Sequence, residues 1–152
     1  MLLGIISDTH GLLRPEALHA LRGVKLIIHA GDVGAPEILA QLKGIAPVFA
    51  VRGNVDTQAW TRELPETTVV EAAGLSLYVL HNLYHLDLRP EASGFHVVIS
   101  GHTHQPEQHE RGGVLYLNPG SAGPRRFRLP VTVALLNAAE KPLRAKILPL
   151  LV

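Results

Sequence analysis

Short apolar segments alternate with two amphipathic segments in the first third of the chain. The apolar segments 2–7 and 25–30 have the length of strands, and residues 15–22 between them carry apolar positions at helical spacing after a proline. Residues 36–43 predict a second helix closed by Gly44, and residues 47–51 predict a third, buried strand. This order predicts a first sheet that is largely parallel, with helices packed against it.

Beyond residue 66 the helical spacing gives way to strand-like segments. Strands are expected at 67–71, 75–80, 97–100, 114–117, 131–137 and 144–148, with a turn at Gly74 and a short helix around Pro90. We therefore predict an α/β (α+β) protein in which two sheets pack together, the later strands form mixed pairs and the helices lie outside. With no internal repeat or linker, residues 1–152 are expected to form a single domain.

Composition narrows the class of protein. A chain of 152 residues with 47% hydrophobic residues can build a core without disulfides, and it contains no cysteine. The net charge of +1 offers no broad cationic field, so we expect no nucleic-acid polymer as partner. No apolar stretch is long enough to cross a bilayer and the first one lacks the flanks of a signal peptide, so we expect a soluble cytoplasmic protein without membrane contact.

Polar side chains that commonly bind metals follow the predicted strands. In an extended segment residues i and i+2 face the same way, so Asp8 with His10 and His102 with His104 can each grip one ion. A glycine precedes three of these positions, where a missing Cβ permits a sharp turn and close approach. The candidate ligands are Asp8, His10, Asp32, Asn54, His81, His102 and His104, and the glycines are Gly31, Gly53 and Gly101.

The composition of this ligand set indicates its chemistry. Two carboxylates, one amide and four imidazoles exceed what one ion with an open position needs and suit two ions that share a bridge. Mixed nitrogen and oxygen ligands favour divalent transition metals, namely manganese, nickel, iron, cobalt or zinc, and the ligand types do not choose among these. We expect manganese. Two divalent ions and two carboxylates leave the site cationic, which favours an anionic substrate such as a small phosphoester.

Six sequence blocks together resemble the small calcineurin-like metallophosphoesterases, in particular the YfcE-like phosphodiesterases. The resemblance runs from Leu3 to about Arg126 and implies a four-layer αββα sandwich of two mixed β-sheets. It also implies that Asp8, His10, Asp32 and His104 hold one ion, and that Asp32 bridges to a second ion completed by Asn54, His81 and His102. The blocks are Ser-Asp-Thr-His-Gly at 7–11, Gly-Asp at 31–32, Gly-Asn-Val-Asp at 53–56, His81, Gly-His-Thr-His at 101–104 and Asn-Pro-Gly-Ser at 118–121.

The activity implied by this resemblance is hydrolysis of small phosphodiesters, with nucleotide-derived diesters as one candidate group. In that family a metal-bound hydroxide attacks phosphorus, and Asp32, Asn54 and His81 are the residues expected to support catalysis. The chain departs from the pattern at Val55, where larger members carry a His that can protonate the leaving group and small members often carry Cys. A second departure follows His81, where relatives often continue Gly-His and this chain reads Asn-Leu-Tyr-His at 82–85, with His85 as a candidate substitute. The rival hypothesis is a non-catalytic binding scaffold that resembles a retromer subunit of the same fold.

Several other residues allow both a structural and a functional interpretation. His29 lies within an apolar segment and is expected to be structural. Asp56 is either a helix N-cap or a support of the site, and residues 118–121 form either a plain turn or a loop that orients metal ligands. Arg125, Arg126 and Arg128 suit either a solvated face or a phosphate clamp. The alternating tail 145–151 suits an edge strand, through which a homo-oligomer could form.

Overall fold

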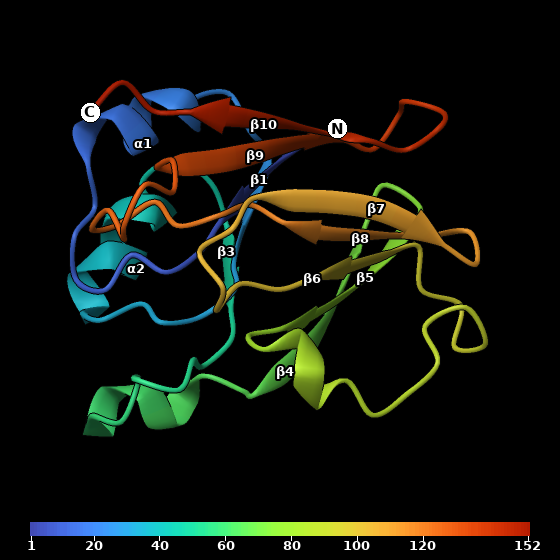
Figure 1. Ribbon diagram of the computed structural model, residues 1–152, viewed down its shortest axis with the longest axis horizontal. Helices are drawn as coiled ribbons and strands as arrows, with labels where there is room; N and C mark the ends of the chain where they lie inside the picture. Colours follow the sequence, from blue (N-terminus) through green and yellow to red (C-terminus); the bar gives the residue numbers. More distant parts are fainter.

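The computed structural model describes residues 1–152 and contains two five-stranded sheets that pack face to face (Figure 1). The first sheet has the strand order β10-β9-β1-β2-β3, and the second has the order β4-β5-β6-β8-β7. The strands of the first sheet are β1 (Leu2–Ile6), β2 (Leu26–His29), β3 (Val48–Ala50), β9 (Thr132–Asn137) and β10 (Ala145–Pro149). Those of the second sheet are β4 (Thr67–Ala72), β5 (Leu75–Leu80), β6 (Val97–Ile99), β7 (Glu107–Arg111) and β8 (Val114–Asn118).

Both sheets are mixed. In the first sheet β1 pairs in parallel with β2, and β2 with β3, whereas β9 pairs antiparallel with β1 and with β10. In the second sheet β5, β6 and β8 are parallel, and the outer strands β4 and β7 are antiparallel to their neighbours. The expectation of a largely parallel first sheet was therefore wrong, because the last two strands of the chain return to it beside β1 (Figure 1).

Alternation along the strands produces two apolar layers on the first sheet. Ile5 and Ile28 face the second sheet and join a cluster of 18 buried residues between the sheets. Their neighbours Ile6 and Ile27 face the other way and pack with the helices in a cluster of 14 buried residues. This is the period of two expected for strands buried on both faces. The helical elements are α1 (Pro15–Ala20), α2 (Pro36–Lys43) and the 3-10 helices η1 (Ala59–Glu63) and η2 (Leu83–His85).

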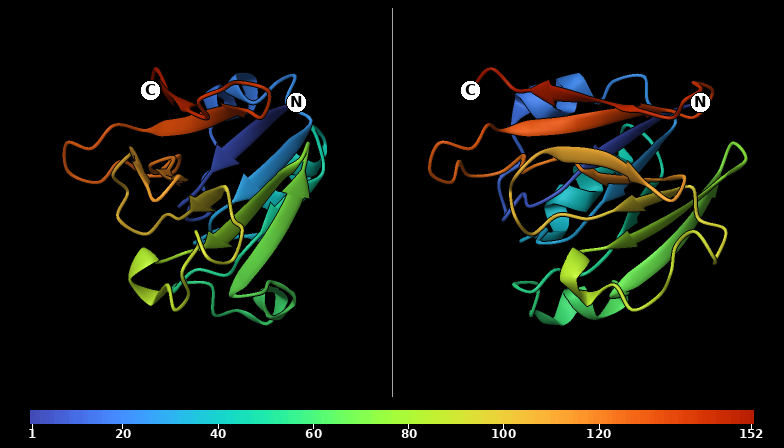
Figure 2. Two further views of the ribbon diagram at one scale, coloured as in Figure 1. Left: turned by 90° about the vertical axis from the view of Figure 1, so that its right-hand side faces the viewer. Right: turned by 45° about the vertical axis from the view of Figure 1, so that its right-hand side comes forward.

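The outer face of the second sheet is covered by a thin layer. Tyr78, Val98 and Tyr116 on this face belong to a cluster of five buried residues, and apolar side chains of η2 and of the loop after it pack against them. The sandwich of two mixed sheets is thus confirmed, with α1 and α2 outside the first sheet and η2 with its loop outside the second (Figure 2). None of the helices has the length and apolar character that a membrane span requires.

Three local expectations differ from the structure. The strand expected to be buried at 47–51 is the edge strand β3, whose Phe49 is 41% exposed because no further strand covers it. The helix expected near Pro90 is a turn in which the backbone N–H of Ala92 donates to the carbonyl of Arg89. Strand β7 was missed, because its sequence Glu-Gln-His-Glu-Arg is polar throughout and shows no alternation.

Candidate metal centre

The fold brings the ends of five strands of the two sheets to one place. Asp8 and His10 follow β1, Asp32 follows β2 and Asn54 follows β3, all from the first sheet. The second sheet contributes His81 after β5 and the pair His102 and His104 after β6. Two groups form, each with its ligand atoms within 4.8 Å of one another: Asp8, His10 and His104 in one, and Asp32, His81 and His102 in the other.

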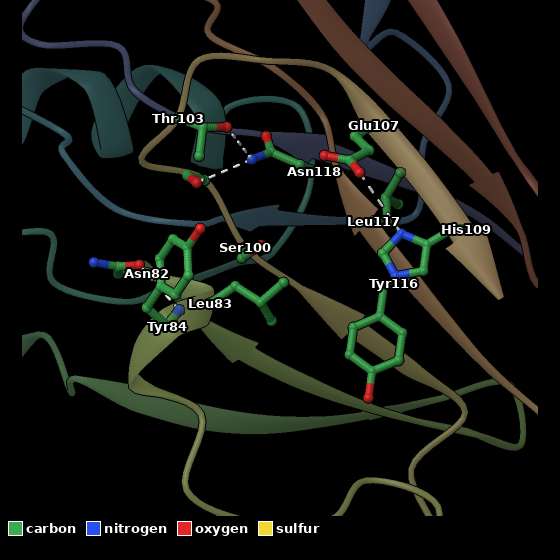
Figure 3. Close-up of a pocket in the computed structure, with 11 residues that line it drawn as sticks. Asn82, Leu83, Tyr84, Ser100, Thr103, Glu107, His109, Tyr116, Leu117 and Asn118 are labelled. Atoms are coloured by element: carbon green, nitrogen blue, oxygen red, sulfur yellow. Dashed lines mark hydrogen bonds and ion pairs between the residues drawn. The ribbon is translucent and has the colours of Figure 1, made fainter. Parts of the chain in front are cut away.

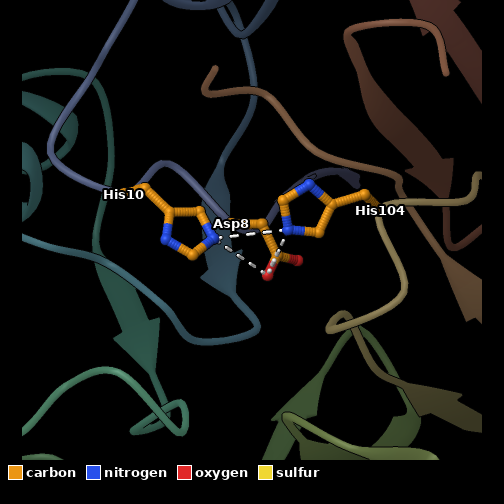
Figure 4. A group of neighbouring side chains, drawn as sticks. All are labelled: Asp8, His10 and His104. Carbon is orange, nitrogen blue, oxygen red and sulfur yellow. Dashed lines mark hydrogen bonds and ion pairs between the residues drawn. The ribbon is translucent and has the colours of Figure 1, made fainter. Parts of the chain in front are cut away.

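In the first group two imidazoles point toward one carboxylate oxygen (Figure 4). The Nε2 atoms of His10 and His104 are 3.3 Å apart. They lie 3.7 and 3.4 Å, respectively, from Oδ1 of Asp8. Three ligand atoms thus converge on a space that one cation could occupy.

Asp32 of the second group also lies close to the first. Oδ2 of Asp32 lies 3.2 Å from Nε2 of His81 and 3.6 Å from Nε2 of His10. Asn54 enters on the far side, where its Oδ1 is 3.2 Å from Nδ1 of His102. Asp32 therefore lies between the two groups of candidate ligands.

In both Asp8 and Asp32, one carboxylate oxygen accepts hydrogen bonds from the protein and the other faces the candidate metal centre. Oδ2 of Asp8 accepts hydrogen bonds from the Ser7 hydroxyl at 2.7 Å and from the backbone N–H of His102 at 3.1 Å. Oδ1 of Asp32 accepts from the backbone N–H of Val55 at 3.0 Å. These bonds fix the orientation of both carboxylates.

His81 is oriented through its second nitrogen. Its Nδ1 lies 2.7 Å from the backbone carbonyl of Ala30, which can only accept, so Nδ1 carries the proton and Nε2 is left as the ligand atom. Because Ala30 follows β2 and His81 follows β5, this bond also joins the two sheets at the centre.

Buried polar atoms without partners indicate that a cation fits this place. Oδ1 of Asp8 and Nε2 of His81 are both buried and make no hydrogen bond, although such atoms are rarely left unpaired. Both are the atoms that face the converging ligands. A divalent ion coordinated by them would compensate the cost of burying them. Nδ1 of His104 is also buried and unpartnered, and since its Nε2 faces the centre, a metal does not explain it.

The charges in the centre depend strongly on one another. Burial opposes ionisation of Asp8, but the imidazoles of His10 and His104 that face its carboxylate hold its pKa well below the usual range. The nearby Asp8 carboxylate raises the pKa of His10. Burial lowers the pKa of His81, but the carboxylates of Asp32 and Asp8 and the carbonyl of Ala30 together outweigh it, so the net shift is upward. A cation that binds here would compete with protons for the imidazole nitrogens.

The backbone is left-handed at the ligand positions. Five of the seven non-glycine residues with positive φ are candidate ligands. Left-handed backbone costs an L-residue about 1 to 2 kcal/mol, although Asp and His tolerate it better than most. Such strain concentrates at functional sites. These five residues are Asp8 (φ 55°), His10 (46°), Asp32 (56°), His102 (73°) and His104 (62°).

Two glycines permit the close packing of the ligand loops. A Cβ on Gly101 would lie 2.6 Å from Oδ2 of Asp8, and one on Gly31 would lie 2.7 Å from Nδ1 of His81. Both distances are shorter than any real carbon contact. The close approach expected from the glycines that precede the ligands is therefore present at both positions.

Asp56 and Asn118 hold the ligand loops together. Asp56 is 2% exposed and does not cap η1, whose N-cap is Gln58. Its carboxylate accepts hydrogen bonds from the backbone N–H groups of Val33, Gly34 and Gly53, which ties the loop of Asp32 to the loop of Asn54. Asn118 donates to the carbonyl of Gly101 and to the hydroxyl of Thr103, and Ser121 donates to the carbonyl of Asp8. Residues 118–121 thus form a supporting loop as well as a turn.

The other candidates from the sequence lie around the centre. His29 is fully buried, lies 3.0 Å from the Thr9 hydroxyl and accepts the backbone N–H of Gly31, and it belongs to neither ligand group. Burial lowers its pKa to about 4. Arg125, Arg126 and Arg128 are exposed in a loop, and the charge of Arg126 acts on His10.

Two clefts adjoin the ligand loops. One, of about 280 Å³, lies on the outer face of the second sheet, where Tyr84, Thr103 and Tyr116 line it and His109 stacks against Tyr116 (Figure 3). The other, of about 570 Å³, opens directly onto Asn54 and His81. Its volume is within the range of small-molecule sites.

Known proteins resemble this chain along nearly its whole length. A probable metallophosphoesterase of Methanothermobacter thermautotrophicus is 39% identical, over 93% of this chain and 88% of that protein. The phosphodiesterase YfcE of Escherichia coli is 29% identical, over 90% and 88% of the two chains. Among solved structures, an archaeal phosphodiesterase aligns with a TM-score of 0.81 at 26% identity, covering 97% of this chain and all of the other.

Vps29 of Entamoeba histolytica also shares the fold, with a TM-score of 0.75, 23% identity and coverage of 98% and 99% of the two chains. At this identity the likeness concerns the fold alone. The family model of the calcineurin-like phosphoesterase superfamily domain matches residues 1–141. With this match and the 39% identical relative, the chain belongs to the calcineurin-like phosphoesterase superfamily.

Proposed function

We propose that this protein is a dinuclear metal-dependent phosphodiesterase that hydrolyses small phosphoesters. The observation that carries the proposal is the convergence of two carboxylates, four imidazoles and one amide on two adjacent groups, with buried ligand atoms left unpaired. Family membership supports the reaction class, and relatives named phosphodiesterase support the diester.

The proposed ligands divide between two ions. Asp8, His10 and His104 would hold the first, His81, His102 and Asn54 the second, and Asp32 would bridge them through Oδ2. Two bound divalent ions would supply an activated water at neutral pH and neutralise charge on the phosphoryl oxygens. Mixed nitrogen and oxygen ligands favour manganese, nickel, iron, cobalt or zinc, and we take manganese as first choice.

The residues of the chain contribute orientation and charge. Asp32 holds the two ligand groups at a fixed spacing, because Val55 fixes its other oxygen. Asn54 can ligate through oxygen and still donate an N–H to a phosphoryl oxygen. His81 is locked by Ala30 so that its Nε2 faces the same point.

The cleft beside the centre favours small substrates. It holds about 570 Å³ and is lined mainly by polar side chains, among them Arg52, Asn82 and Asp87. A space of this size accommodates one organic group of a diester rather than a polymer. We therefore propose small soluble diesters, including nucleotide-derived ones, with monoesters as second choice.

The decisive experiment is a metal-reconstitution assay. Metal-stripped protein, resupplied with manganese, nickel or zinc, is assayed on bis(p-nitrophenyl) phosphate and p-nitrophenyl phosphate beside Asp32→Ala and His102→Ala. We expect faster cleavage of the diester and loss of turnover in both variants. Equal, background-level hydrolysis by the wild type and the variants would refute the enzyme and favour a binding scaffold such as a Vps29-like subunit.

A further inference from the structure

The side chain that follows Asn54 cannot assist the leaving group. Val55 stands there, 43% exposed, and its aliphatic side chain has no proton to donate. Its backbone N–H is already committed to Asp32. An alkoxide leaving group is strongly basic, and a positioned acid is worth about 10² to 10⁴ in rate. Another side chain near the centre is therefore needed if unactivated diesters are the substrates.

The cleft that opens onto Asn54 and His81 defines where such a donor can be. Its walls run from these two residues to η2 and to Asp87 beyond it. A group that leaves phosphorus on this side enters the cleft. The side chains in the cleft that can hydrogen-bond and are not ligands are Arg52, Glu66, Thr67, Tyr78, Asn82, His85 and Asp87.

Most of these side chains are poor proton donors near neutral pH. A guanidinium does not deprotonate, and Arg52 is held by Glu66 at 3.1 Å. Carboxyl groups are normally ionised in this range and phenols are in general weak acids, and Tyr78 is moreover buried in the cluster on the outer face of the second sheet. Hydroxyl and amide groups do not act as acids in this range. An imidazole is the one side-chain type that normally holds and releases a proton between pH 5 and 8.

His85 supplies such an imidazole from a backbone turn that is held in place. It lies four residues after His81 in η2, and this turn is held by the bond from its backbone N–H to the carbonyl of Asn82. The Asn82 side chain caps the turn by accepting the N–H of Tyr84 at 3.1 Å. His85 lines the cleft, is exposed, and makes no hydrogen bond or ion pair through its ring.

We propose that His85 is the general acid of the phosphodiesterase function proposed above. As the oxygen of the attacking water bonds to phosphorus, the bond from phosphorus to the ester oxygen breaks and its electron pair moves to that oxygen. The His85 imidazolium transfers its N–H proton to this oxygen, so that the product leaves as a neutral alcohol. The proton that the attacking water loses passes to solvent, from which His85 is protonated again.

Leaving-group dependence tests this role. Wild type, His85→Gln and the control His19→Gln, an exposed histidine on α1, are assayed on methyl aryl phosphates whose leaving phenols run from p-nitrophenol to unsubstituted phenol. For His85→Gln we expect the loss in kcat to be smallest with p-nitrophenol and to grow to about 10² to 10⁴ with phenol. Metal content and thermal midpoint should equal those of the wild type, because His85 is neither ligand nor core.

The outcomes distinguish a failure of the His85 role from a failure of the proposed phosphodiesterase function. If the wild type cleaves the series and His85→Gln loses the same factor on every ester, or nothing, His85 is not the acid while the phosphodiesterase stands. Loss of bound metal in His85→Gln would also overturn the role, since the residue would then be a ligand. If the wild type cleaves no ester in the series, the phosphodiesterase function itself falls, and the role of His85 with it.

Discussion

Replacing Asp56 tests whether the metal centre depends on a support that binds no metal. The Asp56 carboxylate accepts three backbone N–H groups, from Val33 at 3.2 Å, Gly34 at 3.2 Å and Gly53 at 2.9 Å. A buried N–H that loses its acceptor costs about 1 to 3 kcal/mol, so even in the lower half of this range the three N–H groups left by Asp56→Ala should lower the free energy of unfolding by about 3 to 5 kcal/mol. That is a large part of the roughly 5 to 15 kcal/mol typical of a domain.

Urea denaturation of the metal-stripped protein measures this loss. With a slope of about 2 kcal/mol/M, the midpoint should fall by about 2 M. Asp56→Asn keeps one acceptor oxygen, the one needed for two of the three bonds, and should lose only about 1 to 2 kcal/mol. Glu140→Ala, at an exposed acidic residue whose side chain makes no hydrogen bond or ion pair, is the control and should change nothing. A loss below about 1 kcal/mol for Asp56→Ala, with unchanged slope, would refute the idea that Asp56 joins the ligand loops.

Three further results are expected. By NMR, His29 should titrate near pH 4, whereas a histidine in the unfolded chain takes up a proton at pH 6.5. As the pH falls from 6.5 to about 4, the unfolded state is therefore favoured and about 3 kcal/mol of the free energy of unfolding is lost. An ordinary pKa for His29 would contradict its burial. Gly101→Ala should weaken metal binding, since its Cβ would lie 2.6 Å from the Asp8 carboxylate, whereas Gly44→Ala at the end of α2 should bind metal normally; equal affinities would argue against the close approach. A divalent ion at about 1,000 times its Kd should stabilise the wild type by about 4 kcal/mol and Asp32→Ala far less, as measured by thermal unfolding with and without chelator; equal shifts would place the ion elsewhere.

The strands that build the centre were predictable because they are apolar and short. Each ends in a polar ligand, so β1, β2, β5 and β6 could be located to within a residue or two. The polar strand β7 carried no such signal; its only clue was Gly112-Gly113, the pair at the hairpin between β7 and β8. The pairing of β9 with β1 could not be read from local sequence, because it depends on contacts between distant parts of the chain.

The candidate ligands could be chosen from the sequence, but their supports could not. The spacing of positions i and i+2 pointed to Asp8 with His10, which do lie in one group. It also pointed to His102 with His104 as a pair on one ion, which was wrong, because the structure places His104 in the first group and His102 in the second. The roles of Asp56 and Asn118 stayed open, because a carboxylate that caps a helix and one that ties two loops have the same sequence appearance. The left-handed backbone at the ligands was equally invisible, since only glycine announces positive φ in a sequence.

Because the candidate ligands come from both sheets, a metal ion bound by them would cross-link the two layers of the sandwich. Asp8, His10 and Asp32 extend from one layer, and His81, His102 and His104 from the other. The two sheets can then separate only after the metal has dissociated. The lifetime of the folded, metal-loaded protein should therefore follow the rate of metal dissociation rather than the unfolding barrier of the metal-free protein.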